Sequence, residues 1–321
     1  MSDPAVSPRV SVVVLTHNRC EELCRSLRRL PGHHPLFVVD NGSTDGTTAR
    51  VARAFPHAVL IQAGANLGAA GRNLGVARVA TPYVAFCDDD TWWAAGALEL
   101  AADLLDAHPE VAVLNAGIVV GPEERTDPAC AAMADSPLPA IAGVGPELTG
   151  FMAGACVMRT AAFVQAGGYW EALFIGGEEE LLAMDIMARG GRIAYAPQLR
   201  VHHWPSAARD RPLRRRMLAR NALWTAWLRL PARLALARSV AALRALFGLT
   251  EAEARLASAL VAGWTVEEYA RGRGITVGTA RYQLNQVLGK AGARRQADLV
   301  RQVLCSAAAQ MIGRQEGAAP A

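Results

Sequence analysis

Three consecutive carboxylates, Asp88-Asp89-Asp90, follow an apolar run at residues 83–87 and are the sharpest chemical signal in this sequence. Adjacent carboxylates repel one another, so the cluster costs stability unless a cation neutralises it. Residues 88 and 90 project to the same side of an extended chain. This pair would therefore suit a hard divalent ion such as Mg²⁺ or Mn²⁺, which prefers oxygen ligands. The alternative is a solvated acidic turn that caps the helix after it.

A second acidic cluster, Glu178-Glu179-Glu180, follows two glycines. A carboxylate beside other carboxylates has a raised pKa, which suits a general base that takes a proton from a hydroxyl group. The alternative is an acidic N-terminus for a helix at 180–189, stabilised by the helix dipole, and both interpretations can hold together. His202-His203 ends a strand-like run, and the register of that strand decides which of the two histidines points inward.

The elements that must position these residues alternate between strand and helix patterns. Strands are predicted at residues 10–15, 36–39, 59–62 and 83–87, and helices at 21–30, 47–54 and 68–79. Such alternation predicts an α/β fold with a doubly wound, mostly parallel sheet, in which ligands bind beyond the carboxyl ends of the strands. The polar clusters at 16–19, 40–45 and 88–90 lie at these ends.

The sequence changes character after Pro205. Residues 207–246 are rich in Arg and Ala with a helical pattern, and four short helices are predicted at 251–262, 266–271, 277–290 and 294–304. Thr250, Thr265 and Thr276 directly precede the first three of these helices, and we expect them to be the N-caps. Residues 313–321 are expected to fray.

Composition excludes several classes of protein. Hydrophobic residues make up 52% of the chain and charged residues 19%, which excludes a chain disordered throughout. No stretch of 18 apolar residues lacks a charge, and the N-terminus does not resemble a signal peptide, so neither a transmembrane helix nor a secretory signal is expected. Six scattered cysteines predict free thiols in a reducing cytosol.

Charge is segregated along the chain. Residues 1–208 carry a net charge of −8, residues 209–238 of +8, and the remainder of +4. An acidic body, a basic connector and a mildly basic tail indicate two functional parts with different partners.

Four ordered segments, VSVVVLTHNR, VVDNGSTDGT, NLGAAGRNLGVA and VAFCDDD, resemble the motifs of family 2 glycosyltransferases of the GT-A fold. The likeness continues through residues 167–206 and covers about residues 9–230. It implies an inverting enzyme that moves a sugar from a nucleotide-diphosphate sugar to a hydroxyl acceptor, which would be a cell-surface polysaccharide, a glycolipid or a metabolite. It also implies a divalent metal cofactor, Mg²⁺ or Mn²⁺.

The resemblance assigns roles to individual residues. The nucleotide sugar would be held by Thr16, His17, Arg19, Asp40, Asn41, Ser43, Arg72, Asp88 and Asp89, and the metal by Asp88, Asp90, His202 and His203. Glu179 would be the catalytic base and Glu178 would bind the acceptor, with the small residues 150–156 as the floor of its pocket. The sequence departs from the family at His17, where an aromatic residue is common, and at Glu178-Glu179, where Glu-Asp is usual.

Residues 249–300 resemble the LuxR-type helix-turn-helix domain, which implies DNA binding and a homodimer. The helix at 276–290 would enter the major groove. The expected DNA contacts are Val277, Gly278, Arg281, Tyr282, Lys290, Arg294 and Arg295. A protein–protein module of the same fold, or a relic without binding activity, is the alternative.

These observations predict a glycosyltransferase domain at 1–230, a helical connector at 231–247, a LuxR-type domain at 248–306 and a disordered tail at 307–321. The nine arginines of residues 209–238 could bind an anionic membrane surface, be solvated or pack on the acidic body. We expect a cytoplasmic enzyme, at the inner face of the membrane if the connector binds lipid. The alternative function is a transcription regulator whose glycosyltransferase-like part senses a nucleotide sugar.

Overall fold

The computed structural model describes residues 8–205 and 211–305, without the side chains of 211–216, 236, 301, 302, 304 and 305. The described residues form two compact units: residues 8–174 and 178–205 form the first, and residues 175–177 and 211–305 form the second. The predicted end of the first domain at residue 230 differs from this division by about 20 residues, because the helix at 211–229 packs within the second unit. The predicted tail at 307–321 lies outside the described residues.

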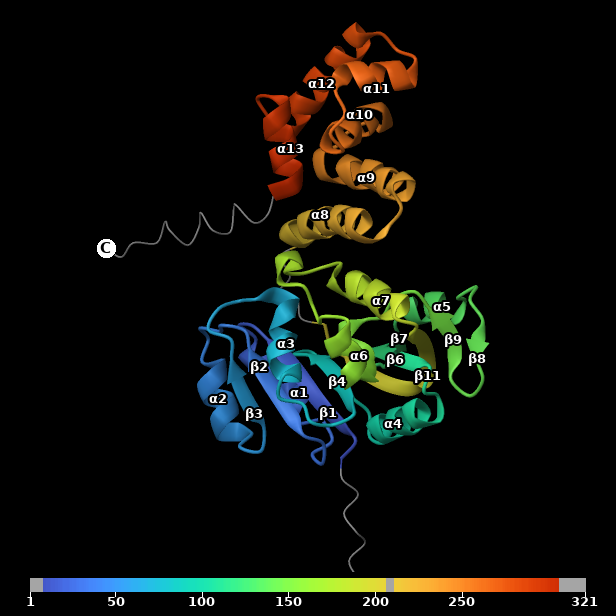
Figure 1. The fold of residues 1–321 in the computed structure, drawn as a ribbon. Coiled ribbons are helices and arrows are strands. Elements are labelled where there is room, and N and C mark those ends of the chain that lie inside the picture. The colour runs from blue at the N-terminus through green and yellow to red at the C-terminus, as the bar shows by residue number, and fades with distance from the viewer. Residues whose placement is uncertain (1–7, 206–210, 306–321) are drawn as a thin grey trace, which may run out of the picture. The chain divides into compact units, whose positions relative to one another are not determined.

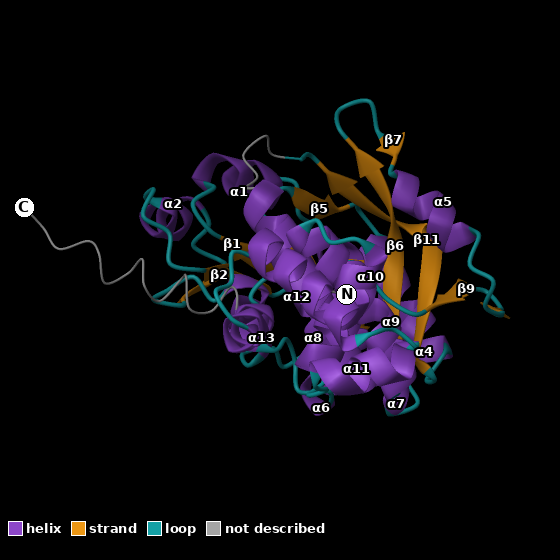
Figure 2. Cartoon of the chain, turned by 90° about the horizontal axis from the view of Figure 1, so that it is seen from above, coloured by secondary structure: helices purple, strands orange, loops and turns teal. Residues whose placement is uncertain are grey.

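The first unit is built on an eleven-stranded, mostly parallel sheet (Figure 1). Its central strand order is β3-β2-β1-β4-β10-β6-β11-β9-β8, with β5 paired to β11 and β7 to β6. The strands are β1 (Val10–Thr16), β2 (Leu36–Asp40), β3 (Val59–Gln62), β4 (Tyr83–Asp88), β5 (Thr91–Trp93), β6 (Val111–Val120), β7 (Arg125–Thr126), β8 (Ala140–Ile141), β9 (Gly145–Leu148), β10 (Cys156–Arg159) and β11 (Arg192–His203). The long strands β6 and β11 run parallel side by side (Figure 2), and β10 is antiparallel to both β4 and β6.

Helices cover both faces of this sheet. The helices of the first unit are α1 (Cys20–Leu27), α2 (Thr47–Ala54), α3 (Gly71–Val76), α4 (Ala97–Ala107), α5 (Pro128–Ala134), α6 (Thr160–Gln165) and α7 (Glu178–Ala188). Alternate residues of β1 enter two different hydrophobic clusters. Val12 belongs to the cluster that includes side chains of α1, α2, α4 and α5, whereas Val13 belongs to the cluster that includes side chains of α3, α6 and α7. The mixed α/β architecture with a mostly parallel central sheet is therefore confirmed.

The register of the sheet brings the carboxyl ends of three strands to one edge. In the pairing of β1 with β2, Thr16 lies opposite Asp40, and in the pairing with β4, Leu15 lies opposite Asp88. The strands predicted from the sequence match within one residue. The helix predicted at 68–79 is shorter in the structure, where α3 spans only Gly71–Val76. A 3₁₀ turn (Gly68–Ala70) precedes it. Gly68 has a φ of 60° and contacts the backbone of Phe174 closely, so a side chain would not fit there.

The described part of the second unit consists of helices α8 (Arg211–Arg229), α9 (Ala232–Phe247), α10 (Glu251–Val261), α11 (Val266–Arg273), α12 (Val277–Ala291) and α13 (Gln296–Cys305). Pro231 separates α8 from α9. The predicted caps are confirmed: Thr250 and Thr265 form capping boxes with Glu253 and Glu268, and Thr276 caps α12. Of the helices described, none is long and apolar enough to span a bilayer.

Candidate active site

The three aspartates lie at a tight turn, not on an extended chain. Strand β4 ends at Asp88, residues 89 and 90 form a turn, and β5 begins at Thr91. The expectation that residues 88 and 90 share one face of an extended strand is therefore corrected. The hydroxyl of Thr91 accepts a hydrogen bond from the backbone N–H of Asp88 at 2.9 Å, which closes the turn.

Two arginines pair with this turn from different elements. Arg72 of α3 is 5% exposed and forms an ion pair with Asp88, while Arg19 reaches Asp89 at 3.2 Å and Asp90 at 3.4 Å. The Nε of Arg72 is buried and has no hydrogen-bond partner among the described residues. A buried guanidinium with an unused donor beside a half-exposed carboxylate is suited to an incoming anionic oxygen.

The two histidines at the end of β11 have different surroundings. His203 points to Asp90, with its Nε2 3.6 Å from the carboxylate. His202 stacks on the Trp92 ring at 5.1 Å and pairs with Glu124 at 3.3 Å. Pairing of β11 with β5 produces this division, because successive side chains of a strand point to opposite faces. Only His203 is therefore placed beside the aspartates.

The donor set at the turn fits a divalent cation such as Mg²⁺ or Mn²⁺. Two guanidinium groups face three carboxylates, and burial, with the neighbouring carboxylates, raises the pKa of Asp89 to about 7. Excess negative charge of this kind is what a cation would neutralise. Among the described residues, the donors here do not converge into a closed three-ligand group. An open site agrees with Mg²⁺, which commonly takes one or two carboxylates and completes its shell with water and substrate phosphates.

Glu179 lies in the first turn of α7, which begins at Glu178, two residues earlier than predicted. Its Oε1 accepts a hydrogen bond from the backbone N–H of Ala153 at 2.6 Å. Burial and the charge of Glu178 raise the pKa of Glu179 to about 7, with a further contribution from Asp88. The acidic cluster and the aspartate turn therefore form one electrostatic site, and an acidic helix N-terminus is also present.

The residues after β1 and β2 that were predicted to bind the nucleotide form hydrogen bonds with one another and with the aspartate turn. Thr16 donates to Asp89 at 3.2 Å, and His17 Nδ1 lies 2.9 Å from the carbonyl oxygen of Asn41. Asp40 accepts a hydrogen bond from the backbone N–H of Ser43 at 2.9 Å, so it shapes the loop that follows β2. These contacts join the strand ends into a continuous polar edge.

Asn41 and Ser43 tie this edge to neighbouring loops. Asn41 donates to the carbonyl oxygen of Gly68 at 2.9 Å and accepts from the backbone N–H of Leu67 at 3.0 Å. The hydroxyl of Ser43 accepts from the backbone N–H of Asn18 at 2.9 Å, where Asn18 has a φ of 53°. Both residues thus hold loops in place.

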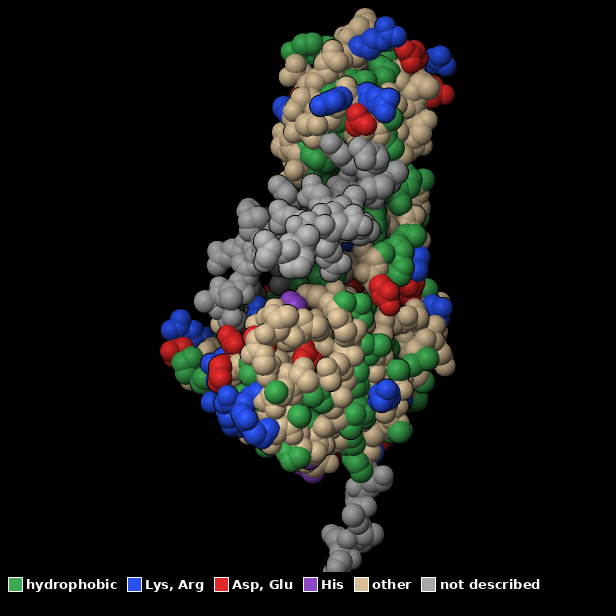
Figure 3. Space-filling view, turned by 90° about the vertical axis from the view of Figure 1, so that its left-hand side faces the viewer, with side chains coloured by type: hydrophobic (Ala, Val, Ile, Leu, Met, Phe, Trp, Pro, Cys, Tyr) green, Lys and Arg blue, Asp and Glu red, His purple; other side chains and the backbone are tan. Residues whose placement is uncertain are grey.

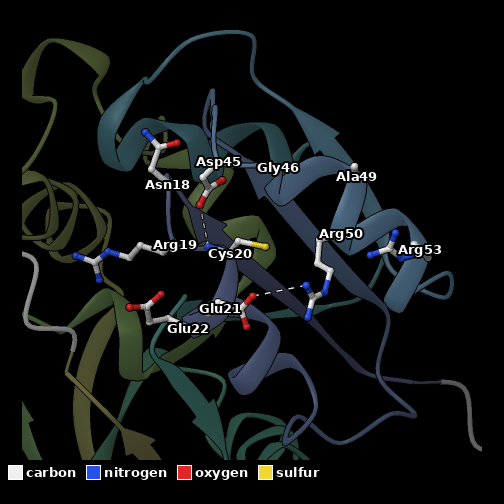
Figure 4. Close-up of a pocket in the computed structure, with 10 residues that line it drawn as sticks. All are labelled: Asn18, Arg19, Cys20, Glu21, Glu22, Asp45, Gly46, Ala49, Arg50 and Arg53. Atoms are coloured by element: carbon white, nitrogen blue, oxygen red, sulfur yellow. Dashed lines mark hydrogen bonds and ion pairs between the residues drawn. The ribbon is translucent and has the colours of Figure 1, made fainter.

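A cavity of about 470 Å³ lies between α1 and α2 (Figure 4). Acidic and basic side chains line it together: Arg50 pairs with Glu21 at 3.6 Å, and Asp45 accepts from the backbone N–H of Cys20 at 3.0 Å. Arg19 lines the cavity but extends away from Arg50, and it is the residue shared with the aspartate turn. The cavity is therefore a neighbour of the aspartate turn and does not contain it.

Sequence reasoning missed the way in which residues 153 and 154 approach the carboxylates. A Cβ on Gly154 would lie 2.8 Å from Oδ2 of Asp88, so only glycine leaves this carboxylate in place. The signal was the run of small residues at 150–156, which we assigned to the acceptor floor. Of the tryptophans in this unit, Trp93 is fully buried and cannot stack on a sugar ring, whereas Trp170 is 45% exposed.

In the helical unit, the predicted DNA-contacting residues are exposed to different degrees. Gly278, Arg281, Tyr282, Arg294 and Arg295 are exposed, and Val277 is partly buried. Arg281 pairs with Glu267 at 3.0 Å. Lys290 forms an ion pair with Glu253 at 2.7 Å, so in this structure it supports the capping box of α10.

The comparisons with known proteins agree with this geometry. Residues 11–165 match the family model described as Glycosyl transferase family 2. The chain resembles the mannosyltransferase PcManGT of Pyrobaculum calidifontis, solved with GDP-Man and Mn²⁺ (TM-score 0.56, 20% identity, 95% of this chain and 89% of that chain covered). It also resembles S. aureus TarS 1-349 with UDP (TM-score 0.54, 18% identity, 97% and 93% covered).

A third similar structure is GalNAc-T7 with UDP, GalNAc and Mn²⁺ (TM-score 0.51, 14% identity, 67% of this chain and 47% of that chain covered). Comparison with curated proteins yields no match. At these identities the solved structures establish a GT-A-like fold, while the family match identifies the domain. Residues 11–165 are thus a glycosyl transferase family 2 domain, and the protein is a glycosyltransferase.

Proposed function

We propose that the protein is an inverting glycosyltransferase that moves a sugar from a nucleotide-diphosphate sugar to a hydroxyl group in one displacement. The observation that carries this proposal is Glu179, a carboxylate with a pKa near 7 in the same electrostatic site as the Asp88–Arg72 pair. The family match ends at residue 165, before Glu179, so the role of this residue rests on its geometry and charge. Similar structures that carry GDP-Man or UDP support a nucleotide-sugar donor.

The donor diphosphate is proposed to lie beside Arg72 and Arg19. Arg72 offers an Nε–H that has no hydrogen-bond partner in the described part of the chain, and Arg19 bridges Asp89 and Asp90 from the loop after β1. Asp88 and Asp90, with His203 beside Asp90, are the residues proposed to hold Mg²⁺ or Mn²⁺. A bound divalent ion would neutralise charge that develops on the departing diphosphate.

Glu179 is proposed to take the proton of the acceptor hydroxyl. The N–H of Ala153 holds Oε1, which orients the carboxylate and leaves Oε2 as the proton acceptor. A base whose pKa is near the working pH combines a useful ionised fraction with sufficient basicity. Glu178, which is 8% exposed, is proposed to bind the acceptor next to this base.

Turnover of a panel of nucleotide sugars by the full-length protein tests this function, first with Mn²⁺ and then with EDTA. Release of nucleoside diphosphate from one donor, dependent on metal, is the expected result. Donor binding without turnover, even when acceptors are supplied, would instead favour the regulator that senses a nucleotide sugar. Failure of every donor to bind would contradict both functions of this domain.

We also propose that α10–α13 form a LuxR-type domain that binds DNA through α12. The support is the sequence resemblance, the capped helices α10, α11 and α12, and the exposed Tyr282 and Arg281. Figure 3 shows basic and acidic side chains next to each other on the visible face of this unit, so the affinity is proposed to depend on α12 more than on a broad basic surface.

Anisotropy of a labelled duplex tests DNA binding. Tyr282→Ala should weaken binding, and Trp264→Ala, which changes an exposed aromatic residue outside α12, is the control. Equal affinities of the two variants and the native protein would contradict the assignment of α12. We further propose a cytoplasmic homodimer whose residues 209–238 contact anionic lipid. Vesicle flotation tests the lipid contact and light scattering tests the dimer.

A further inference from the structure

A cluster of two histidines and a glutamate lies far along the sheet from the aspartate turn. His33 and His34 occupy the loop between α1 and β2, and Glu99 is in the first turn of α4. The ring nitrogen of His34 that faces away from this cluster lies 3.3 Å from the carbonyl oxygen of Val10, the first residue of β1. The cluster is therefore at the amino end of β1, whereas Asp88 follows the carboxyl ends of the parallel strands.

The donor atoms of the three residues converge. The Nε2 atoms of both His33 and His34 contact the same oxygen, Oε1 of Glu99, at 3.1 Å in the case of His34. One donor atom from each residue lies within 4.8 Å of the other two, and this is the one such group found among the described residues. Ligands of a tetrahedral zinc ion, each about 2.0–2.1 Å from the metal, are about 3.3 Å apart, so small side-chain rotations would admit the ion.

Two further observations point to a ligand. The second carboxylate oxygen of Glu99 is buried and has no hydrogen-bond partner among the described residues, which is costly for an ionised group. His34 is 8% exposed, and the contact of its Nδ1 with Val10 directs Nε2 into the cluster. A second contact of this kind is typical of histidines that bind metal.

The ionisation of His34 agrees with ligation. Burial lowers the pKa of His34 despite the nearby Glu99, which favours the neutral imidazole. Metal binding requires the neutral imidazole and the ionised carboxylate. The alternative is a hydrogen-bonded His–Glu cluster that binds no ion.

We propose that His33, His34 and Glu99 form a zinc site that fastens the loop between α1 and β2 to α4. Two imidazole nitrogens and one carboxylate are a common set of zinc ligands, and water would complete the tetrahedron. Because the site is remote from Asp88, Asp90 and Glu179, its role is to stabilise the fold and not to take part in glycosyl transfer. The proposal therefore does not depend on the proposed function.

Calorimetric titration of the EDTA-treated full-length protein with Zn²⁺, in the presence of millimolar Mg²⁺, tests the site. One Zn²⁺ per chain should bind, and the dissociation constant should rise about tenfold or more in His33→Gln and in Glu99→Gln. His57→Gln, which changes an exposed histidine outside the cluster, is the matched control and should bind as the native protein does. Asp90→Asn should also bind one Zn²⁺ per chain, because it affects only the aspartate turn.

Thermal denaturation and visible absorption provide independent readouts. Zn²⁺ should raise the Tm of the native protein and of His57→Gln by several degrees, but not that of His33→Gln, an exposed position at which the substitution should be tolerated. Co²⁺ bound at the site should give the absorption of a tetrahedral complex. The absence of Zn²⁺ binding, equal affinities of His33→Gln and the native protein, or loss of the zinc equivalent in Asp90→Asn would each overturn the proposal.

Discussion

Substitution of Glu179 by glutamine should abolish most of the activity and at the same time stabilise the protein. The amide oxygen of the introduced glutamine can still accept the hydrogen bond from the N–H of Ala153, so the start of α7 should keep its structure. Loss of the base should lower kcat by a factor of about 10² to 10⁴. Glu180→Gln, which changes the adjacent, partly buried glutamate, is the matched control and should remain active.

The stabilisation follows from the pKa. Folding raises the pKa of Glu179 from 4.5 to about 7, so ionised Glu179 destabilises the native state. This cost is fully present above pH 7 and disappears as the pH falls towards 4.5. Full burial would make it ~3 kcal/mol, and the partial exposure of Glu179 reduces it to about 1–2 kcal/mol. Urea denaturation at pH 8 should show Glu179→Gln to be more stable by this amount, and at pH 4.5 the difference should vanish.

The same pKa predicts the pH dependence of the native enzyme. As the pH falls below 7 the base becomes protonated, so kcat should fall about fivefold between pH 7 and pH 6, and it should level off above pH 8. The assay is release of nucleoside diphosphate with saturating donor, acceptor and Mn²⁺. A rate that is constant from pH 5.5 to pH 8.5, or Glu179→Gln with the activity of Glu180→Gln, would refute the assignment of the base.

Three further predictions concern other parts of the chain. Asp90→Ala should nearly abolish metal-dependent transfer, because Asp90 is 2% exposed and interacts with Arg19 and His203; native turnover in the presence of Mn²⁺ would contradict its proposed role. Gly154→Ala should displace the partly exposed carboxylate of Asp88 and lower kcat about tenfold to hundredfold with little change in Tm, whereas unaltered kinetics would show that this close approach has no catalytic importance. Thr265→Ala should lower the free energy of unfolding of the helical unit by ~1 kcal/mol in urea denaturation, whereas Thr265→Ser should leave it unchanged. An equal loss of stability in both variants would exclude the capping box as the cause.

Local pattern was sufficient to predict the strands and helices between residues 10 and 88. The strand at 83–87 follows from a short run of apolar residues, and the caps at Thr250 and Thr265 follow from hydroxyl groups placed before helices. The sequence also predicted that the carboxyl ends of the parallel strands meet at one edge of the sheet, because parallel strands run in the same direction. The turn at 89–90 was stated only as the alternative to an extended chain, because adjacent aspartates are compatible with both.

The sequence by itself determined the family 2 domain and the positions of its candidate acids and bases, since these depend on residue type and on neighbours along the chain. Only the tertiary structure decided that His203 and not His202 faces Asp90, because strand register is set by pairing between distant segments. It also brought His34 to Glu99 across 65 residues of sequence. The elevated pKa of Glu179 has the same origin, because burial and nearby charges depend on the folded chain in three dimensions.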